Sequence, residues 1–253
     1  MKRLGRTSGV RSSSLQVARG TISTQQAIRF REYGLMSHRP SNSTAPYLGQ
    51  SGRGAYRLWV DGVGAYLLCL GNQITIGGPS GSSEDKAEIS LLANLSRQHV
   101  RLIRSGEVWL LEPLGPVQVD ERPIVKHSLL NDGNCLRLGS SVILRFRSPS
   151  PLSGTARLDF ESSHRTQPSV DGVILFAETC VIGPGSDAHI RSVSATATHN
   201  DGSVLLIRRA DGLWCKSVQP IQIDGTAAGL EVACEPDRVY SGPNWRFRME
   251  GVD

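Results

Sequence analysis

From residue 55 onward, the sequence repeats itself at a spacing of about one hundred residues. Arg57-Leu58 returns as Arg157-Leu158, and Asp61-Gly62 returns as Asp171-Gly172. Further matches follow in the same order: Ile76-Gly77 with Ile182-Gly183, Leu102–Arg104 with Leu206–Arg208, Trp109 with Trp214, Pro116–Asp120 with Pro220–Asp224, and Arg145–Arg147 with Arg246–Arg248. Ordered matches whose spacing drifts slightly indicate a duplication with loop insertions. The sequence therefore predicts two copies of one domain-sized unit.

Each copy consists of short apolar runs separated by turn signals. Six Asp-Gly pairs mark positions where a positive φ is tolerated and hairpins can close. Apolar and polar residues alternate in Leu144–Arg147 and Trp245–Met249, which places them on opposite faces of a strand. We expect an all-β body with tandem β-sandwiches. The expected divisions are a first domain at residues 55–148, a linker at 149–154 and a second domain at 155–250.

Residues 1–54 differ from the rest in composition. Residues 1–53 carry nine basic side chains and one acidic side chain, a charge of +8, so the remaining residues carry −3. The segment is rich in Ser, Thr, Gly and Arg, which predicts a disordered leader. It could also be a functionless tail, a mis-assigned start with Met36 as the true first residue, a transit peptide or a nucleic-acid-binding arm. The charge gives no reason to expect nucleic-acid binding by the folded part.

Several classes of protein are disfavoured by the remaining features. The five cysteines are scattered and odd in number, so we expect no disulfide framework, no CxxC metal site, and a reducing, cytoplasmic location. The longest apolar runs, Ala65–Leu70 and Val173–Ala177, are far shorter than the ~20 residues of a membrane span. The histidines show no metal-ligand spacing. We therefore expect no membrane association, metal or other cofactor.

Catalysis is not expected either. Ser96 and His99 could suggest a nucleophile and its base, but no Gly-x-Ser-x-Gly elbow surrounds them. Gly77–Ser83 is glycine-rich, yet it lacks the Gly-Lys-Ser/Thr ending of a phosphate-binding loop. We therefore interpret both stretches as ordinary loops and expect the protein not to be an enzyme.

The first copy contains a series of motifs in a characteristic order: Ile76-Gly77, Ala87–Leu91, Leu95–Val100, Val108–Pro113, Val119–Ile124, Leu130–Asn134 and Leu136–Gly139. In this order they resemble the forkhead-associated (FHA) domain over residues 55–148. The second copy resembles it only through its likeness to the first. The resemblance implies eleven-stranded sandwiches of the SMAD/FHA type and a non-enzymatic signalling adaptor. It also implies that loops at one end bind phosphothreonine on a partner that a Ser/Thr kinase has modified.

A phosphothreonine brings about −1.5 to −2 charges and three acceptor oxygens, so its site needs clustered donors. The resemblance implies that Ser96 and Arg97 donate to the phosphate and that Gly77 and His99 brace their loop. Gly78 stands where the family has an arginine, and Pro113–Pro116 replaces its Asn-Gly-Thr turn. Lys86 or Arg122 could compensate for the missing arginine. Gly78→Arg is expected to strengthen binding, provided that position 78 has backbone angles that a non-glycine residue can adopt.

The second copy departs further from the family pattern. Gly183-Pro184 lacks the arginine, and Asn200-Asp201 stands where Ser96-Arg97 stands in the first copy. An aspartate at that position would repel a phosphate, so we expect this copy to be a degenerate FHA domain that does not bind phosphate. Two hypotheses remain for the whole chain: phosphothreonine recognition by the first copy, or a phosphate-independent scaffold in which neither copy binds phosphate.

Overall fold

The computed structural model describes residues 54–80, 86–150, 153–192 and 202–252. These residues form twenty strands and their connections, which confirms the all-β prediction. No helix in the described part of the chain is long and apolar enough to cross a membrane. The predicted leader lies outside the described residues, except for Gly54. The strands form one five-stranded and one fifteen-stranded sheet.

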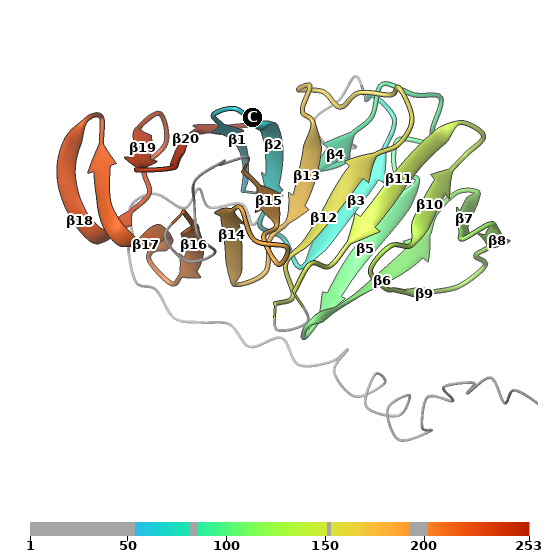
Figure 1. The fold of residues 1–253 in the computed structure, drawn as a ribbon. Coiled ribbons are helices and arrows are strands. Elements are labelled where there is room, and N and C mark those ends of the chain that lie inside the picture. The colour runs from blue at the N-terminus through green and yellow to red at the C-terminus, as the bar shows by residue number, and fades with distance from the viewer. Residues whose placement is uncertain (1–53, 81–85, 151–152, 193–201, 253) are drawn as a thin grey trace, which may run out of the picture. The chain divides into compact units, whose positions relative to one another are not determined.

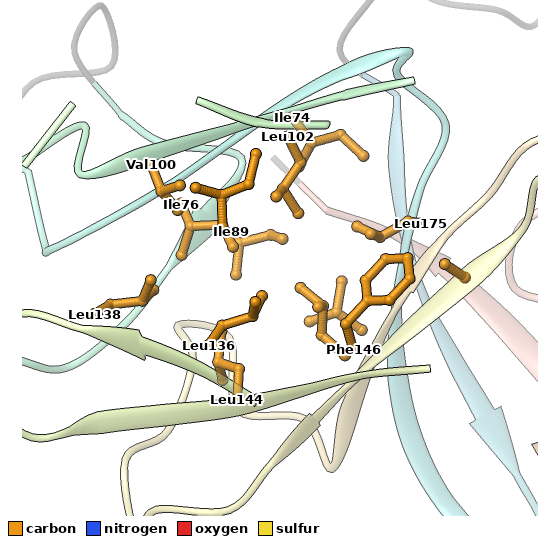
Figure 2. Packing of buried hydrophobic residues seen from close by; sticks show 14 of the residues in the cluster. Ile74, Ile76, Ile89, Val100, Leu102, Leu136, Leu138, Leu144, Phe146 and Leu175 are labelled. Carbon is orange, nitrogen blue, oxygen red and sulfur yellow. The ribbon is translucent and has the colours of Figure 1, made fainter. Parts of the chain in front are cut away.

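The first sandwich encloses the first core between the small sheet and one part of the long sheet. The small sheet has the order β4 (Ile89–Ser90), β3 (Gln73–Gly77), β5 (Val100–Ser105), β6 (Val108–Pro113) and β9 (Ser128–Leu130). The facing strands are β13 (Gly172–Leu175), β12 (Ala156–Phe160), β11 (Val142–Arg147), β10 (Cys135–Leu138), β7 (Val117–Val119) and β8 (Arg122–Pro123). Figure 2 shows Ile76 and Leu102 of the small sheet opposite Leu136 and Phe146.

The second sandwich uses the other part of the long sheet. Its strands are, in order, β15 (Ile190–Arg191), β14 (Thr179–Gly183), β16 (Val204–Arg209), β17 (Gly212–Ile223), β19 (Val239–Gly242), β20 (Trp245–Gly251), β1 (Ala55–Val60) and β2 (Gly64–Cys69), with β18 (Thr226–Ala233) paired to β17. In the second core, the rings of Tyr240 and Phe247 stack at 5.1 Å. β17 pairs with β16 over its first half and with β19 at its end.

The two repeats have exchanged their first hairpins. The β1–β2 hairpin belongs to the first repeat, yet β1 pairs with β20 at the end of the second. The β12–β13 hairpin belongs to the second repeat, yet β12 pairs with β11 of the first. Figure 1 shows this exchange, with blue-green β1 and β2 close to red β20 and yellow β12 beside green β11.

The exchanged hairpins meet through a parallel pairing of β2 with β13. Along β2, Leu67 faces the first core while Leu68 faces the second, and along β13, Leu175 and Ile174 divide in the same way. Strands buried on both faces read as continuous apolar runs rather than as alternating ones. This double burial explains the two apolar runs in the sequence, and it makes these strands part of both cores.

The observed pairing corrects the predicted division at residues 149–154. Ala156 and Leu158, which lie beyond that linker, are buried in the first core. Leu58 and Val60, which lie before it, are buried in the second core. The boundary between the repeats therefore does not coincide with the boundary between the cores. Trp109 of β6 donates a buried indole hydrogen bond to the Gly154 carbonyl at 2.7 Å, which fixes the end of the connecting segment.

Candidate phosphopeptide site

The β4–β5 loop, residues 91–99, forms one end of the first sandwich together with the ends of β3 and β4. We call this end the loop rim. The Gly78 amide donates to the Ser96 carbonyl at 2.8 Å, and the Leu91 amide donates to the Gly77 carbonyl at 2.8 Å. A Cβ atom at Gly77 would overlap the Arg97 carbonyl. The absence of a side chain at Gly77 therefore lets the loop backbone lie directly against β3.

His99 connects the β4–β5 loop with the β6–β7 turn. It is 3% exposed, and its Nε2 lies 2.9 Å from the Pro116 carbonyl, to which it donates. Its own carbonyl accepts hydrogen bonds from the amides of Leu114 and Gly115. On the other side of the ring, Nδ1 accepts the Ser96 amide at 3.4 Å. The imidazole thus holds the backbone beside Ser96 through contacts inside the domain, while the loop surface stays available to a ligand.

Ser96 and Arg97 are adjacent, exposed side chains at the loop rim. One hydroxyl and one guanidinium together can offer several N–H and O–H donors to an anionic oxygen cluster. Their backbone is held by β3 and by His99, so little loop ordering would be needed when a ligand binds. This arrangement is suited to binding a phosphate monoester on an exposed peptide segment.

Lys86 lies away from Ser96 and Arg97. β4 runs parallel to β3 with Ile89 opposite Ile76, and the Glu88 carboxylate accepts the Thr75 amide at 2.8 Å. Continuing this register places Lys86 near the start of β3, where it lines a depression with Gln73. The loop rim lies at the other end of β3, about 13 Å away at ~3.3 Å per residue. The expectation that Lys86 belongs to the phosphate site is therefore corrected, because Lys86 lies at the opposite end of β3.

Arg122 is also remote from the loop rim. It pairs with Val119 at the end of β7, whereas the β6–β7 turn precedes the start of that strand. The β7–β8 turn has a positive φ at both Asp120 and Glu121, and Asp120 is fixed by hydrogen bonds from Asn134 and the Cys135 amide. This tight hairpin directs Arg122 to the far end of β7. The fold therefore places neither Lys86 nor Arg122 beside Ser96 and Arg97.

Gly78 is buried and in contact with the loop backbone. A Cβ atom there would lie 2.5 Å from the Leu95 carbonyl oxygen, closer than packed atoms approach. Gly78→Arg would push the β4–β5 loop away from β3 before its guanidinium could reach a ligand. The expectation that this substitution strengthens binding is therefore wrong for this backbone.

The second sandwich lacks the corresponding turn. β17 runs without interruption from Gly212 to Ile223, whereas the first sandwich divides the equivalent stretch into β6, a turn and β7. A Cβ atom at Gly183, the equivalent of Gly77, would overlap the Ser203 side chain. Pro184 occupies the position equivalent to Gly78, so this copy also lacks the arginine of the family pattern. Asn200 and Asp201 lie outside the described residues.

A segment of the second repeat reaches the loop rim of the first sandwich. The β12–β13 connection, residues 161–171, places the Arg165 carbonyl 2.8 Å from the Leu92 amide, which donates to it. The neighbouring Thr166 forms an antiparallel bridge with Leu91. Sequence reasoning missed this contact, although a signal existed: the repeat spacing increases between Arg157 and Asp171, which marks an insertion in this connection.

Other features of the surface are less suited to an anion. A depression of about 630 Å³ on the second sandwich is lined by Asp61, Asp224 and Arg246. Hydrogen bonds from the Val239 amide and Arg238 lower the pKa of Asp224, so this carboxylate stays charged and opposes a phosphate. Within the described ranges, no group of His, Cys, Asp and Glu is arranged to hold a metal ion.

Comparison with solved structures finds FHA domains among the chains to which this chain is similar. No protein-family model matches the chain. No curated protein matches it. Among solved structures, the chain is similar to the Rv0020c FHA domain, at 27% identity over 36% of this chain and 90% of that one, with a TM-score of 0.25. The FHA domain of CT664 from Chlamydia trachomatis is 26% identical over 34% and 90%, with a TM-score of 0.24.

A longer match is the N-terminal FHA domain of EssC, a component of the bacterial type VII secretion apparatus. It covers 78% of this chain and 95% of that one at 12% identity, with a TM-score of 0.22. Another similar FHA domain, 29% identical over 35% of this chain with a TM-score of 0.26, comes from a study of phosphothreonine-dependent FHA interactions. The chain is thus similar to FHA domains, each of the shorter matches spanning about a third of it.

Proposed function

We propose that the chain is a non-enzymatic protein-binding adaptor that recognises a phosphothreonine-containing partner through the loop rim of the first sandwich. The observation that carries this proposal is the pairing of exposed Ser96 and Arg97 on a loop that buried His99 holds from inside. The family that the sequence resembles consists of interaction modules. The resemblance also suggests an upstream Ser/Thr kinase and a cytoplasmic setting, which we include in the proposal.

Recognition would work by charge-assisted hydrogen bonds. The Arg97 guanidinium and the Ser96 hydroxyl donate to the phosphate oxygens, and the phosphate charge strengthens both contacts. Each such hydrogen bond contributes about 1.5–3 kcal/mol. The unphosphorylated threonine offers only a neutral hydroxyl, so the same donors give discrimination as well as affinity. Because the loop is already held by β3 and the β6–β7 turn, binding costs little ordering of the site.

A phosphate-independent scaffold remains the second candidate function. The observation that favours it is Gly78, which leaves the loop rim without the arginine of the family pattern and without space for one. The distance of Lys86 and Arg122 from the loop rim favours it too. Under this hypothesis the partner binds another surface of the two sandwiches.

The deciding experiment is calorimetric titration of the full chain against a phosphothreonine peptide library and its unphosphorylated counterparts. Ser96→Ala and Arg97→Ala should each weaken phosphopeptide binding about tenfold or more, since each removes a donor to the phosphate. Arg122→Ala is the matched control, because it removes an exposed arginine from the far end of the same sandwich and should change affinity little.

The melting temperature of each variant should stay near that of the wild type, because both side chains at the loop rim are exposed. Equal affinity of the wild-type protein for phosphorylated and unphosphorylated peptides would reject phosphothreonine recognition. In that case the scaffold would be the better description, and a partner should bind regardless of Ser96 and Arg97.

A further inference from the structure

We propose that the exchanged β12–β13 hairpin completes the peptide-binding surface of the first sandwich by supplying Arg165, which selects an acidic residue of the ligand near its phosphothreonine. This inference rests on the proposed phosphothreonine recognition by Ser96 and Arg97. It goes beyond that recognition because a residue of the second repeat would determine the specificity of the first. Neither repeat alone would then carry the whole site.

The Arg165 backbone is fixed to the loop rim on both sides of its side chain. Its carbonyl accepts the Leu92 amide at 2.8 Å, and the Gln167 amide donates to the Ser90 carbonyl at 2.9 Å. Between them, the buried Thr166 forms a backbone bridge with Leu91, and its hydroxyl oxygen accepts a hydrogen bond from the Val170 amide at 3.1 Å. With Thr166 facing inward, the alternation of an extended chain turns Arg165 outward, and its side chain is exposed.

His164 fastens the same segment to the β10–β11 turn. Its Nε2 lies 3.3 Å from the Ser141 hydroxyl, and its Nδ1 lies 3.0 Å from the Ser162 hydroxyl. The Ser162 hydroxyl also accepts the Ile143 amide at 3.1 Å. Hydrogen bonds to two sides of one ring leave this part of the connection little freedom to swing away. Arg165 is therefore presented from a fixed backbone, like Arg97.

Four backbone segments lie side by side along the loop rim, and their order gives the distance between the two arginines. The segment of Ser96 contacts Gly78, the neighbouring Gly77 contacts Leu91, and residues 90–92 contact residues 165–167. Three steps of about 4.8 Å separate the outer backbones by about 14 Å. An extended peptide covers that distance in about four residues, at ~3.3 Å each. Arg165 should therefore face a ligand residue three to five positions from the phosphothreonine.

The charges around Arg165 favour an anionic neighbour. Glu161, at the start of the connection, is held by Arg145 through two hydrogen bonds of 2.7 Å. These hydrogen bonds lower the pKa of Glu161, so its charge is already balanced within the protein. Between the two arginines, the Leu92 side chain is 51% exposed and offers an apolar contact to the intervening part of the peptide. The surface thus presents the Arg97 cation, the apolar Leu92 side chain and the Arg165 cation in that order.

The test uses the full chain and phosphothreonine peptides carrying Asp, Ala or Lys at each position within five residues of the phosphothreonine. For wild type, Asp at one position three to five residues away should bind about two- to fivefold more tightly than Ala, as expected for a solvent-exposed ion pair. Arg165→Ala should abolish this preference, and Arg165→Glu should invert it in favour of Lys. Arg122→Glu, the same charge change at the far end of the sandwich, should leave the preference intact.

The outcomes separate this inference from the function on which it rests. If no phosphopeptide binds the wild type, phosphothreonine recognition fails and the role of Arg165 fails with it. If phosphopeptides bind and Arg97→Ala weakens them, but Arg165→Glu keeps the wild-type preference, only the role of Arg165 is overturned. Recovery of Arg165→Glu binding by the Lys-containing peptide supports a direct contact, because a merely structural role would not respond to the ligand charge.

Discussion

His189 is a histidine whose burial links the stability of this protein to pH. The residue is fully buried, its Nδ1 accepts the Val181 amide at 3.0 Å, and its carbonyl accepts Arg157 of the exchanged hairpin at 2.7 Å. Burial lowers the pKa of His189 from 6.5 to about 4, because the charged imidazolium would lose its hydration. The backbone of His189 is thus part of the contact between β12 and the second sandwich, while its neutral ring is bonded to Val181 of β14.

We therefore expect acid to destabilise the fold through His189. Because the pKa is lower in the folded state, the unfolded chain takes up the proton first, and stability falls as the pH drops from about 6.5 toward 4. Between pH 7 and 5 this group should remove about 2 kcal/mol from the free energy of unfolding. Urea denaturation at both pH values measures this loss, and His189→Gln should show a loss smaller by that amount. Equal losses in the two proteins would contradict the assignment.

At the scale of elements, the hairpin exchange has a local cause. β11 ends at Arg147 and β12 begins at Ala156, so the short connection allows these neighbours in sequence to pair as an antiparallel hairpin. Closing a short loop costs less entropy than bringing distant segments together. Once β12 occupies the edge of β11, the first repeat's own β1 must pair elsewhere, and it pairs with β20.

Cysteine cross-linking should detect this exchange directly. Trp59 on β1 is paired with Arg248 on β20, and both side chains are exposed. Directly paired residues have Cα atoms within the range that a disulfide bridges. The double variant Trp59→Cys/Arg248→Cys should therefore cross-link on oxidation, as seen by mass mapping of the linked peptides. Trp59→Cys/Arg147→Cys is the matched control, because it would cross-link only if β1 paired with β11 of its own repeat.

At the scale of the whole molecule, the two cores share structural elements. β2 and β13 each contribute side chains to both cores, so disrupting one core exposes apolar surface that belongs to strands of the other. The repeats of a simple tandem array can unfold one at a time, whereas cores that share strands should lose their structure together. The described sandwiches should therefore form one cooperative unit.

Calorimetric unfolding tests this coupling with a matched pair of variants. Phe146 and Phe247 are equivalent residues of the two repeats, and each is buried in a different core. Phe146→Ala and Phe247→Ala should each cost about 3–5 kcal/mol. Each should shift the same single transition to lower temperature. Two resolved transitions, with only one of them moved by each variant, would show that the cores are independent.

Patterns in the sequence predicted the strands and indicated the repeat, and the resemblance to FHA domains implied that Gly77 braces the loop of Ser96 and Arg97. These features depend on local physics: alternation assigns the faces of a strand, Asp-Gly pairs allow tight turns, and a glycine permits close backbone contact. Such patterns are encoded within a few residues. The apolar run Val173–Ala177 predicted only that no membrane span is present, and the burial of Ile174 and Leu175 in different cores is seen only in the structure.

The pairing of strands in three dimensions determines which repeat completes which core and which side chains lie at the loop rim. Two similar repeats present similar strand edges, so the sequence pattern of β12 fits either partner, and the short connection to β11 determines the choice. The parallel register of β3 and β4 removes Lys86 from Ser96. The same pairing geometry brings Arg165 of the second repeat to Leu92 of the first, because hydrogen-bonded edges, rather than proximity in sequence, determine which loops meet.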